Sequence, residues 1–234
     1  MATESHLLER AASSAGATAV PSPLTSHGRL RAGGTVVALR HGSVIGPGRL
    51  VDRAVVDGTR LVGADDADGT SWWIPAAAVW CDGENTDVPE HPRRIGLATA
   101  ANAAAAVVQG LSDRLGWEAV LHLDDGRQLP ALEPVSDLDP DHFVVFDGRL
   151  GHDLPTVVVV GAEVTCWGAG STWERALHRA LYGAGSACAA PGELAAFVTA
   201  LAEVGLRPAT VDLGSPRLRA HGIVRCSVQL LATS

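Results

Sequence analysis

The stretch TVVVVGAEVTCWGAGSTWERALHRALYGA, residues 156–184, decides the fold class. Its four consecutive valines lack the polar alternation of a half-exposed strand, so they predict a strand over Thr156–Gly168 that is covered on both faces. Ser171 and Thr172 are residue types that cap helices, and the sequence after them predicts a helix that ends at Leu181. A strand followed at once by a helix indicates a domain in which both kinds of element pack together.

The flanking sequence extends this pattern in both directions. Downstream, Pro191–Val204 predicts a helix with an apolar stripe, and Gly205 ends it. Upstream, apolar residues at helical spacing predict a helix over Ala98–Leu115. The other predicted strands are short runs between turns: Thr35–Leu39, Ala54–Val56, Arg60–Gly63, Ser71–Pro75, Ala119–Leu123, His142–Phe146, Arg207–Leu213 and Gly222–Leu231. This order predicts an α+β fold with a mixed or antiparallel sheet and packed helices.

The composition excludes several classes of function. All 18 basic residues are arginine, so the chain has no lysine for a Schiff base or for a lysine-bearing phosphate loop. The formal net charge of −8 argues against broad nucleic-acid binding. No apolar run has the length of a membrane span, and Glu4 and Glu9 stand where a signal peptide would be basic and then apolar. We therefore expect a cytoplasmic protein without membrane or nucleic-acid partners.

Metal-site spacings are absent from the sequence. The four cysteines form no Cys-x-x-Cys pair and the nine histidines no His-Glu-x-x-His pattern, so no metal site is expected. Residues 1–27 end in a stretch rich in Ala, Ser and Pro, and we expect them to form a flexible N-terminal segment before a single domain over residues 28–234. The turn GAGS at residues 168–171 is interpreted as a helix-entry turn, with a phosphate-cradling turn as the alternative.

Two segments together resemble the YcaO family, whose members use ATP to modify peptide backbones. Gly96–Ala119, GLATAANAAAAVVQGLSDRLGWEA, is similar to the family's Gly-Leu-Ala start and the helix that carries a Glu-x-x-Glu-Arg-Asp run. Gly168–Ala184 is similar to the family's Gly-x-Gly and a helix of the form Ala-Leu-x-Arg-Ala-Leu-x-Glu-Ala. The resemblance spans Leu61–Leu231 and implies a YcaO-like fold in a chain of roughly half the family's usual length.

The chain departs from the family at the acidic helix. Aligned without gaps, Asp113 replaces the first Glu, Gly116 the second, Trp117 the Arg and Glu118 the Asp, while Gly183 replaces the Glu of the second helix. In the family these carboxylates hold magnesium and the nucleotide phosphates. The resemblance therefore implies that Asp113 and Glu118 are remnants of that site, because a glycine cannot ligate a cation and a tryptophan cannot clamp a phosphate. We expect Trp117 to fill the vacated pocket as part of the core.

These replacements imply a truncated, degenerate YcaO-like protein that acts as a non-catalytic subunit in the biosynthesis of ribosomal peptide natural products of azoline or thioamide type. Such a subunit would support an ATP-dependent peptide-modifying enzyme and would need no cofactor of its own. Its expected partner is a full-length YcaO enzyme, another biosynthetic subunit or a second copy, with a precursor peptide as a further partner. Two alternatives stay open: an active compact YcaO-type cyclodehydratase that uses ATP and magnesium with ligands from a partner chain, and an unrelated α+β binding domain.

Overall fold

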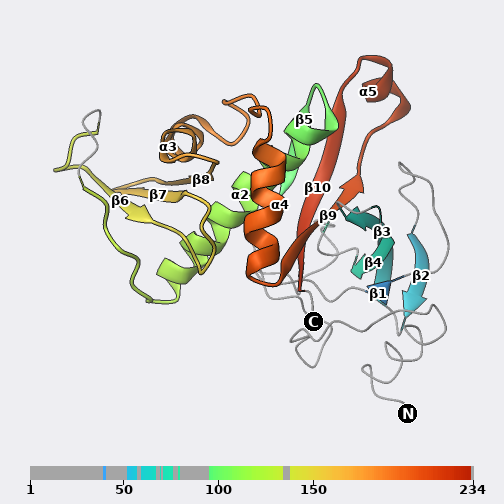
Figure 1. The fold of residues 1–234 in the computed structure, drawn as a ribbon, viewed down its shortest axis with the longest axis horizontal. Coiled ribbons are helices and arrows are strands. Elements are labelled where there is room, and N and C mark those ends of the chain that lie inside the picture. Colours follow the sequence, from blue (N-terminus) through green and yellow to red (C-terminus); the bar gives the residue numbers. More distant parts are fainter. Residues whose placement is uncertain are drawn as a thin grey trace, which may run out of the picture.

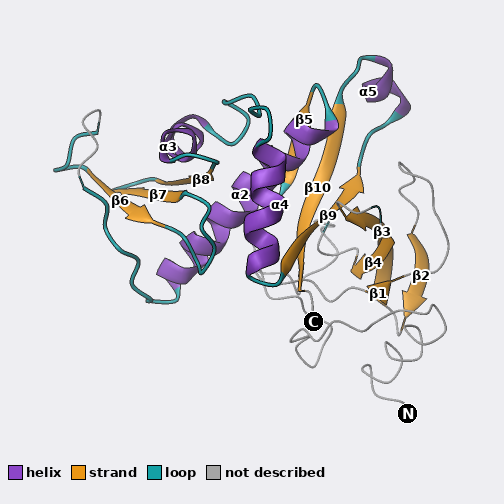
Figure 2. Cartoon of the chain, viewed as in Figure 1, coloured by secondary structure: helices purple, strands orange, loops and turns teal. Residues whose placement is uncertain are grey.

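The computed structural model describes residues 39–40, 52–56, 59–66, 69, 71–75, 79, 95–133 and 138–232. Within them, two antiparallel sheets and packed helices form an α+β fold, which confirms the predicted class (Figures 1 and 2). The large sheet contains β1 (Leu39–Arg40), β2 (Asp52–Val56), β3 (Thr59–Asp66), β4 (Ser71–Pro75), β5 (Leu97–Ala100), β9 (Leu206–Asp212) and β10 (Val224–Ala232). The small sheet contains β6 (Phe143–Asp147), β7 (Thr156–Gly161) and β8 (Thr165–Ala169). The helices are α2 (Ala103–Asp124), α3 (Trp173–Tyr182), α4 (Glu193–Glu203) and α5 (Pro216–Ala220).

The large sheet has the strand order β1-β4-β3-β9-β10-β5, and β2 pairs with β3 beside this path. β9 and β10 pair over seven residues, from Cys226 opposite Asp212 to Ala232 opposite Leu206. β5 forms one end of this order and pairs with β10. The small sheet has the simple meander order β6-β7-β8.

Helix α2 lies between the two sheets, as Figure 1 shows, and glycines permit its close approach to both. A Cβ at Gly110 would lie 2.5 Å from Cγ2 of Val228 on β10. A Cβ at Gly116 would lie 2.5 Å from Cδ1 of Trp167 on β8. Real Cβ atoms do not approach other heavy atoms this closely, so each crossing point requires a glycine.

Hydrophobic clusters fill the space on both sides of α2. Toward the large sheet, α2 residues such as Leu111 pack with Phe197 of α4 and Val228 of β10. Toward the small sheet, Trp117 and Val120 pack against Val158 of β7. On the other face of the small sheet, α3 contributes buried alanines. The central valines of β7 are at most 2% exposed, which confirms that this strand is covered on both faces.

The first predicted helix has different bounds in the structure. It begins at Ala103 rather than Ala98, because Leu97–Ala100 pairs with β10 as strand β5. Asn102 caps the helix. The helix also continues past Gly116 to Asp124, so the strand predicted over Ala119–Leu123 is wrong. That segment is helical because Ala119 and Val120 belong to the buried face of α2.

The strand predicted over Thr156–Gly168 is a hairpin of two strands. β7 and β8 are joined at a turn in which the Gly161 N–H donates to the Val164 C=O at 2.8 Å. The helix that follows is capped by Thr172, whose hydroxyl accepts from the Arg175 N–H at 3.3 Å. The alternative cap, Ser171, directs its side chain to Glu193 instead.

The other predicted elements largely agree with the structure. The strand predictions at Ala54–Val56, Arg60–Gly63, Ser71–Pro75, His142–Phe146, Arg207–Leu213 and Gly222–Leu231 overlap β2, β3, β4, β6, β9 and β10. The predicted helix Pro191–Val204 corresponds to α4. The N-terminal segment 1–27 and the predicted strand Thr35–Leu39, except for Leu39, lie outside the described residues. Of the helices in the described ranges, none combines the length and apolar character of a bilayer span.

Candidate functional site

The structure places four of the five residues singled out from the sequence on α2. Asp113 lies where this helix passes the start of β5 and the middle of β8. Its Oδ2 accepts from the Gly96 N–H at 2.8 Å, and its Oδ1 accepts from the Trp167 indole N–H at 3.0 Å. Both carboxylate oxygens are thus engaged by protein donors that join the helix to two sheets.

Gly116 marks the contact between α2 and β8. Besides the clash with the Trp167 ring, a Cβ at this position would lie 3.0 Å from the backbone nitrogen of Gly168. A backbone atom cannot turn aside as a flexible side chain can. A longer side chain here would therefore separate the helix from the small sheet.

Trp117 is 8% exposed and packs against Trp167. The two ring centroids are 5.2 Å apart, with the planes inclined at 52°. Tilted aromatic pairs at this distance are favourable beyond the area that they bury. Trp117 therefore belongs to the core between α2 and the small sheet.

Glu118 pairs with Arg114 one helical turn earlier. The Arg114 Nε lies 3.3 Å from Oε1 of Glu118, and the Glu118 side chain is 21% exposed. Burial raises the pKa of Glu118 to about 7, and the charge of Arg114 offsets only part of this effect. Burial likewise lowers the pKa of Arg114, against the opposing charges of Glu118 and Asp113. Glu118, one of the residues singled out from the sequence, therefore has a pKa near neutral pH.

Gly183 lies apart from these residues. It ends α3 with a φ of 92°, is exposed, and a Cβ there would meet no atom within 4 Å. Two residues later, a Cβ at Gly185 would lie 3.8 Å from the side chain of Gln109 on α2. The loop after α3 thus passes beside α2, but Gly183 itself makes no contact with Asp113 or Glu118.

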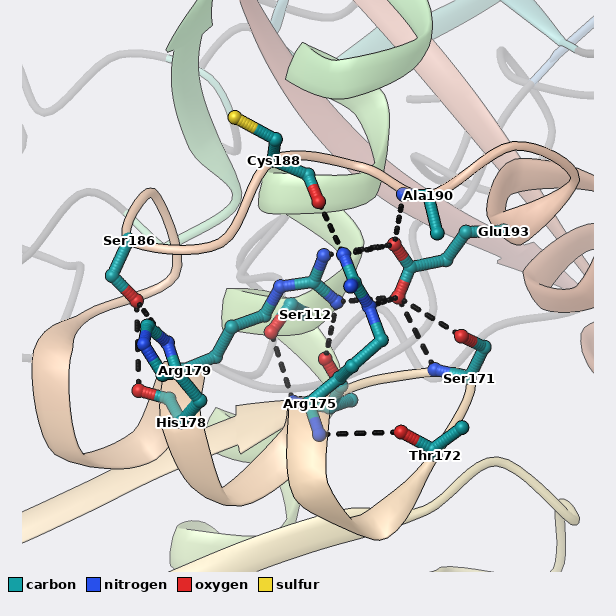
Figure 3. A network of polar contacts seen from close by, with 11 residues as sticks. Ser112, Ser171, Thr172, Arg175, His178, Arg179, Ser186, Cys188, Ala190 and Glu193 are labelled. Atoms are coloured by element: carbon teal, nitrogen blue, oxygen red, sulfur yellow. Dashed lines mark hydrogen bonds and ion pairs between the residues drawn. The ribbon is translucent and has the colours of Figure 1, made fainter.

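A second polar cluster, which we call the Glu193 network, was not identified from the sequence (Figure 3). Glu193 lies in the first turn of α4 with a fully buried side chain. Arg179 donates to both of its carboxylate oxygens, at 2.9 and 3.0 Å, and Arg175 donates to both at 3.0 Å. The Ala190 N–H and the Ser171 N–H also donate to it, at 2.9 and 3.2 Å, as does the Ser171 hydroxyl at 3.3 Å.

The Glu193 network connects the end of β8, α3 and α4. Arg179 also donates to the Ala169 C=O at 2.9 Å, and Arg175 donates to the Cys188 C=O of the intervening loop. Burial alone would raise the pKa of Glu193, but the hydrogen bonds from Arg179 and Arg175 outweigh it and lower this pKa to about 2. The carboxylate is therefore ionised at neutral pH.

The GAGS turn, the phosphate-cradle candidate, contributes to this same network. Its Ser171 N–H and hydroxyl both donate to Oε1 of Glu193. An internal carboxylate thus takes the anion position that a helix N-terminus favours. Among the described residues, no group of three or more His, Cys, Asp or Glu side chains has the arrangement of a metal site.

Comparisons with known proteins support the resemblance at the level of fold. No family model matches the sequence, and no curated protein matches it either. The chain is similar to the structure of YcaO from Methanopyrus kandleri bound with AMPPCP and Mg2+, with a TM-score of 0.56 and 18% identity over 80% of this chain and 68% of that one. It is also similar to the heterocyclase TruD, with a TM-score of 0.51 and 14% identity over 74% of this chain and 34% of that one. The chain thus spans about a third of TruD, and its fold is YcaO-like.

Proposed function

We propose that this chain is a non-catalytic YcaO-like subunit in the biosynthesis of ribosomal peptide natural products, and that it supports an ATP-dependent peptide-modifying enzyme. The observation that carries the proposal is the packing of α2 against β8. On this face Gly116 and Trp117 contact the small sheet, where the family resemblance expects a carboxylate and an arginine. The side chain of Trp167 lies against both positions, which supports the view that the two replacements serve packing rather than nucleotide binding.

The remaining acids are held by donors of the protein itself. Asp113 accepts from Gly96 and Trp167, and Glu118 is paired with Arg114. To coordinate magnesium, Asp113 would have to share oxygens that already accept hydrogen bonds joining α2 to β5 and β8. Donors already bound to a carboxylate weaken its interaction with a cation.

If the register is shifted by three residues, Gly110, Asp113, Arg114 and Leu115 fall on the Glu, Glu, Arg and Asp of the family pattern. Asp113 and Arg114 then keep an acid and the arginine, whereas the first Glu and the Asp are still replaced. In this register too, a glycine stands where the family has a glutamate. A side chain at this position would not fit, because a Cβ at Gly110 would lie 2.5 Å from Cγ2 of Val228 and 2.8 Å from the Gly96 carbonyl oxygen. In both registers a position that needs a carboxylate is a close contact between α2 and a sheet.

Isothermal titration of the purified chain with ATP and magnesium tests the proposal. We expect no binding at micromolar concentrations and no ATP hydrolysis. A second measurement adds the chain to a full-length YcaO enzyme and its precursor peptide, where we expect faster or more complete modification. Micromolar ATP affinity with turnover by the chain alone would contradict the proposal and favour the compact active enzyme.

A further inference from the structure

The outer edge of β5 has backbone groups available for another strand. Within the described residues, β5 pairs with β10 and lies at the end of the large sheet. The Val228 N–H donates to the Gly96 C=O at 2.9 Å, so the alternation of an antiparallel ladder directs the N–H and C=O groups of Leu97 and Thr99 away from β10. No hydrogen bond within the described part of the chain uses these outward groups, and Thr99 is exposed. Such an edge is a template for strand addition.

Positive charge lies beside this edge. Arg225 of β10 is opposite Thr99 in the register, so it lies on the same face of the sheet, one strand in from the edge. In the part of the chain that the structure describes, its side chain has no ion pair. Arg225 therefore places one positive charge, without an ion pair among the described residues, beside the edge.

From these observations we infer that the β5 edge binds an extended acidic peptide by strand addition, with the peptide's carboxylates on the face of Arg225. The backbone of the peptide pairs with Leu97 and Thr99, and its acidic side chains alternate with side chains on the opposite face. A second copy of the chain fits less well, because pairing of two β5 edges would bring two Arg225 side chains to one region. The inference goes beyond the proposed function and does not depend on the nucleotide site.

The geometry specifies which backbone groups of the peptide must be free. We take the added strand to be antiparallel to β5, like the other pairs of this sheet. A peptide residue opposite Thr99 then has its side chain on the Arg225 face and its N–H directed toward β5. In a peptide of alternating Glu and Thr, the Glu residues take these positions. Their N–H groups therefore face the protein, and those of the Thr residues face solvent.

The test measures fluorescence anisotropy of a labelled ten-residue peptide of alternating Glu and Thr with the full chain at low salt. We expect N-methylation of the Glu residues to weaken binding at least tenfold, and N-methylation of the Thr residues to change it less than threefold. Replacement of Glu by Lys in the peptide abolishes binding. Arg225→Glu weakens binding at least tenfold, whereas Arg127→Glu, a change at an exposed arginine in the loop after α2, changes it less than threefold.

Thr99→Pro removes one outward N–H and leaves the ladder to β10 intact, so it also weakens binding at least tenfold. Circular dichroism establishes that each variant is folded. Equal effects of the two N-methylated peptides, or of the two arginine variants, would overturn the inference. So would equally tight binding of a ten-nucleotide oligothymidine. A dimer that Thr99→Pro dissociates, without peptide binding, would assign the edge to a second copy and overturn it as well. Because the assay contains no ATP, its outcome is separate from that of the nucleotide titration.

Discussion

Glu193→Gln is expected to destabilise the protein severely, because the Glu193 network places two arginines around one buried carboxylate. The Arg179 and Glu193 side chains are both 0% exposed. Glutamine retains the shape of glutamate but removes the charge, and its amide N–H₂ group points donors at the guanidinium donors. Removing one partner of a buried ion pair costs about 3–5 kcal/mol. That is a large share of the roughly 5–15 kcal/mol by which a folded domain is stable.

The same contribution makes the stability depend on pH. The pKa of Glu193 falls from its ordinary value of 4.5 to about 2 on folding. A shift of this size corresponds to about 3 kcal/mol. Because the folded-state pKa is the lower one, this stability is fully present above pH 4.5 and is lost as the pH falls toward 2. In Glu193→Gln this part of the pH dependence disappears.

Urea denaturation followed by tryptophan fluorescence, at several pH values, measures both effects. Glu203→Gln is the matched control, since Glu203 is exposed at the other end of α4, and its free energy of unfolding should stay within about 0.5 kcal/mol of the parent. The double variant Arg179→Met with Glu193→Leu should be more stable than Glu193→Gln, because no fully buried charge is then left unpaired and the partly exposed Arg175 can reach solvent. A Glu193→Gln variant within 1 kcal/mol of the parent at pH 7 would refute this account of the Glu193 network.

Three further predictions concern α2. Trp117→Ala should lower the free energy of unfolding by about 3–5 kcal/mol through the cavity it leaves, and thermal denaturation measures this; a shift of a degree or two would contradict the buried position. Gly116→Ala should destabilise by about 1–3 kcal/mol, because its Cβ meets Trp167 and Gly168, whereas Gly126→Ala meets no atom within 4 Å and reports only the strain of a positive φ. The raised pKa of Glu118, about 7, means that the parent loses stability as the pH rises from 4.5 to 7, and Glu118→Gln should flatten this part of the urea-denaturation profile.

The local sequence pattern correctly predicted those elements whose buried residues can be recognised from their own sequence. The valines of β7 predicted a strand covered on both faces, and the apolar stripe of α4 places Phe197 and Leu201 in the core. The secondary-structure predictions were wrong where contact with a segment distant in the sequence determines the local conformation. Leu97–Ala100 is a strand because β10 pairs with it, and α2 continues through Gly116 because β8 leaves no room for a side chain there. Neither partner is recognisable from the neighbouring residues.

The Glu193 network could have been inferred in part. Arg179 falls on the same helical face as Ala176 and Ala180, so the helix period predicts an arginine directed into the core. A buried arginine needs an acid, but the sequence does not say which one, because Glu193 is 14 residues away beyond a loop. Its position could be established only once α3 and α4 were placed relative to each other.

The same network decides between the two interpretations of the GAGS turn. The N–H and hydroxyl of Ser171 are the donors that a phosphate at the start of α3 would use, and Glu193 already accepts from both. With a pKa of about 2, Glu193 stays charged at neutral pH, so an incoming phosphate would meet a fixed negative charge. To displace that carboxylate, the phosphate would also have to separate it from Arg179, at the cost of a buried ion pair. The turn therefore serves the fold as a helix entry, and an anion that reaches this protein must bind elsewhere.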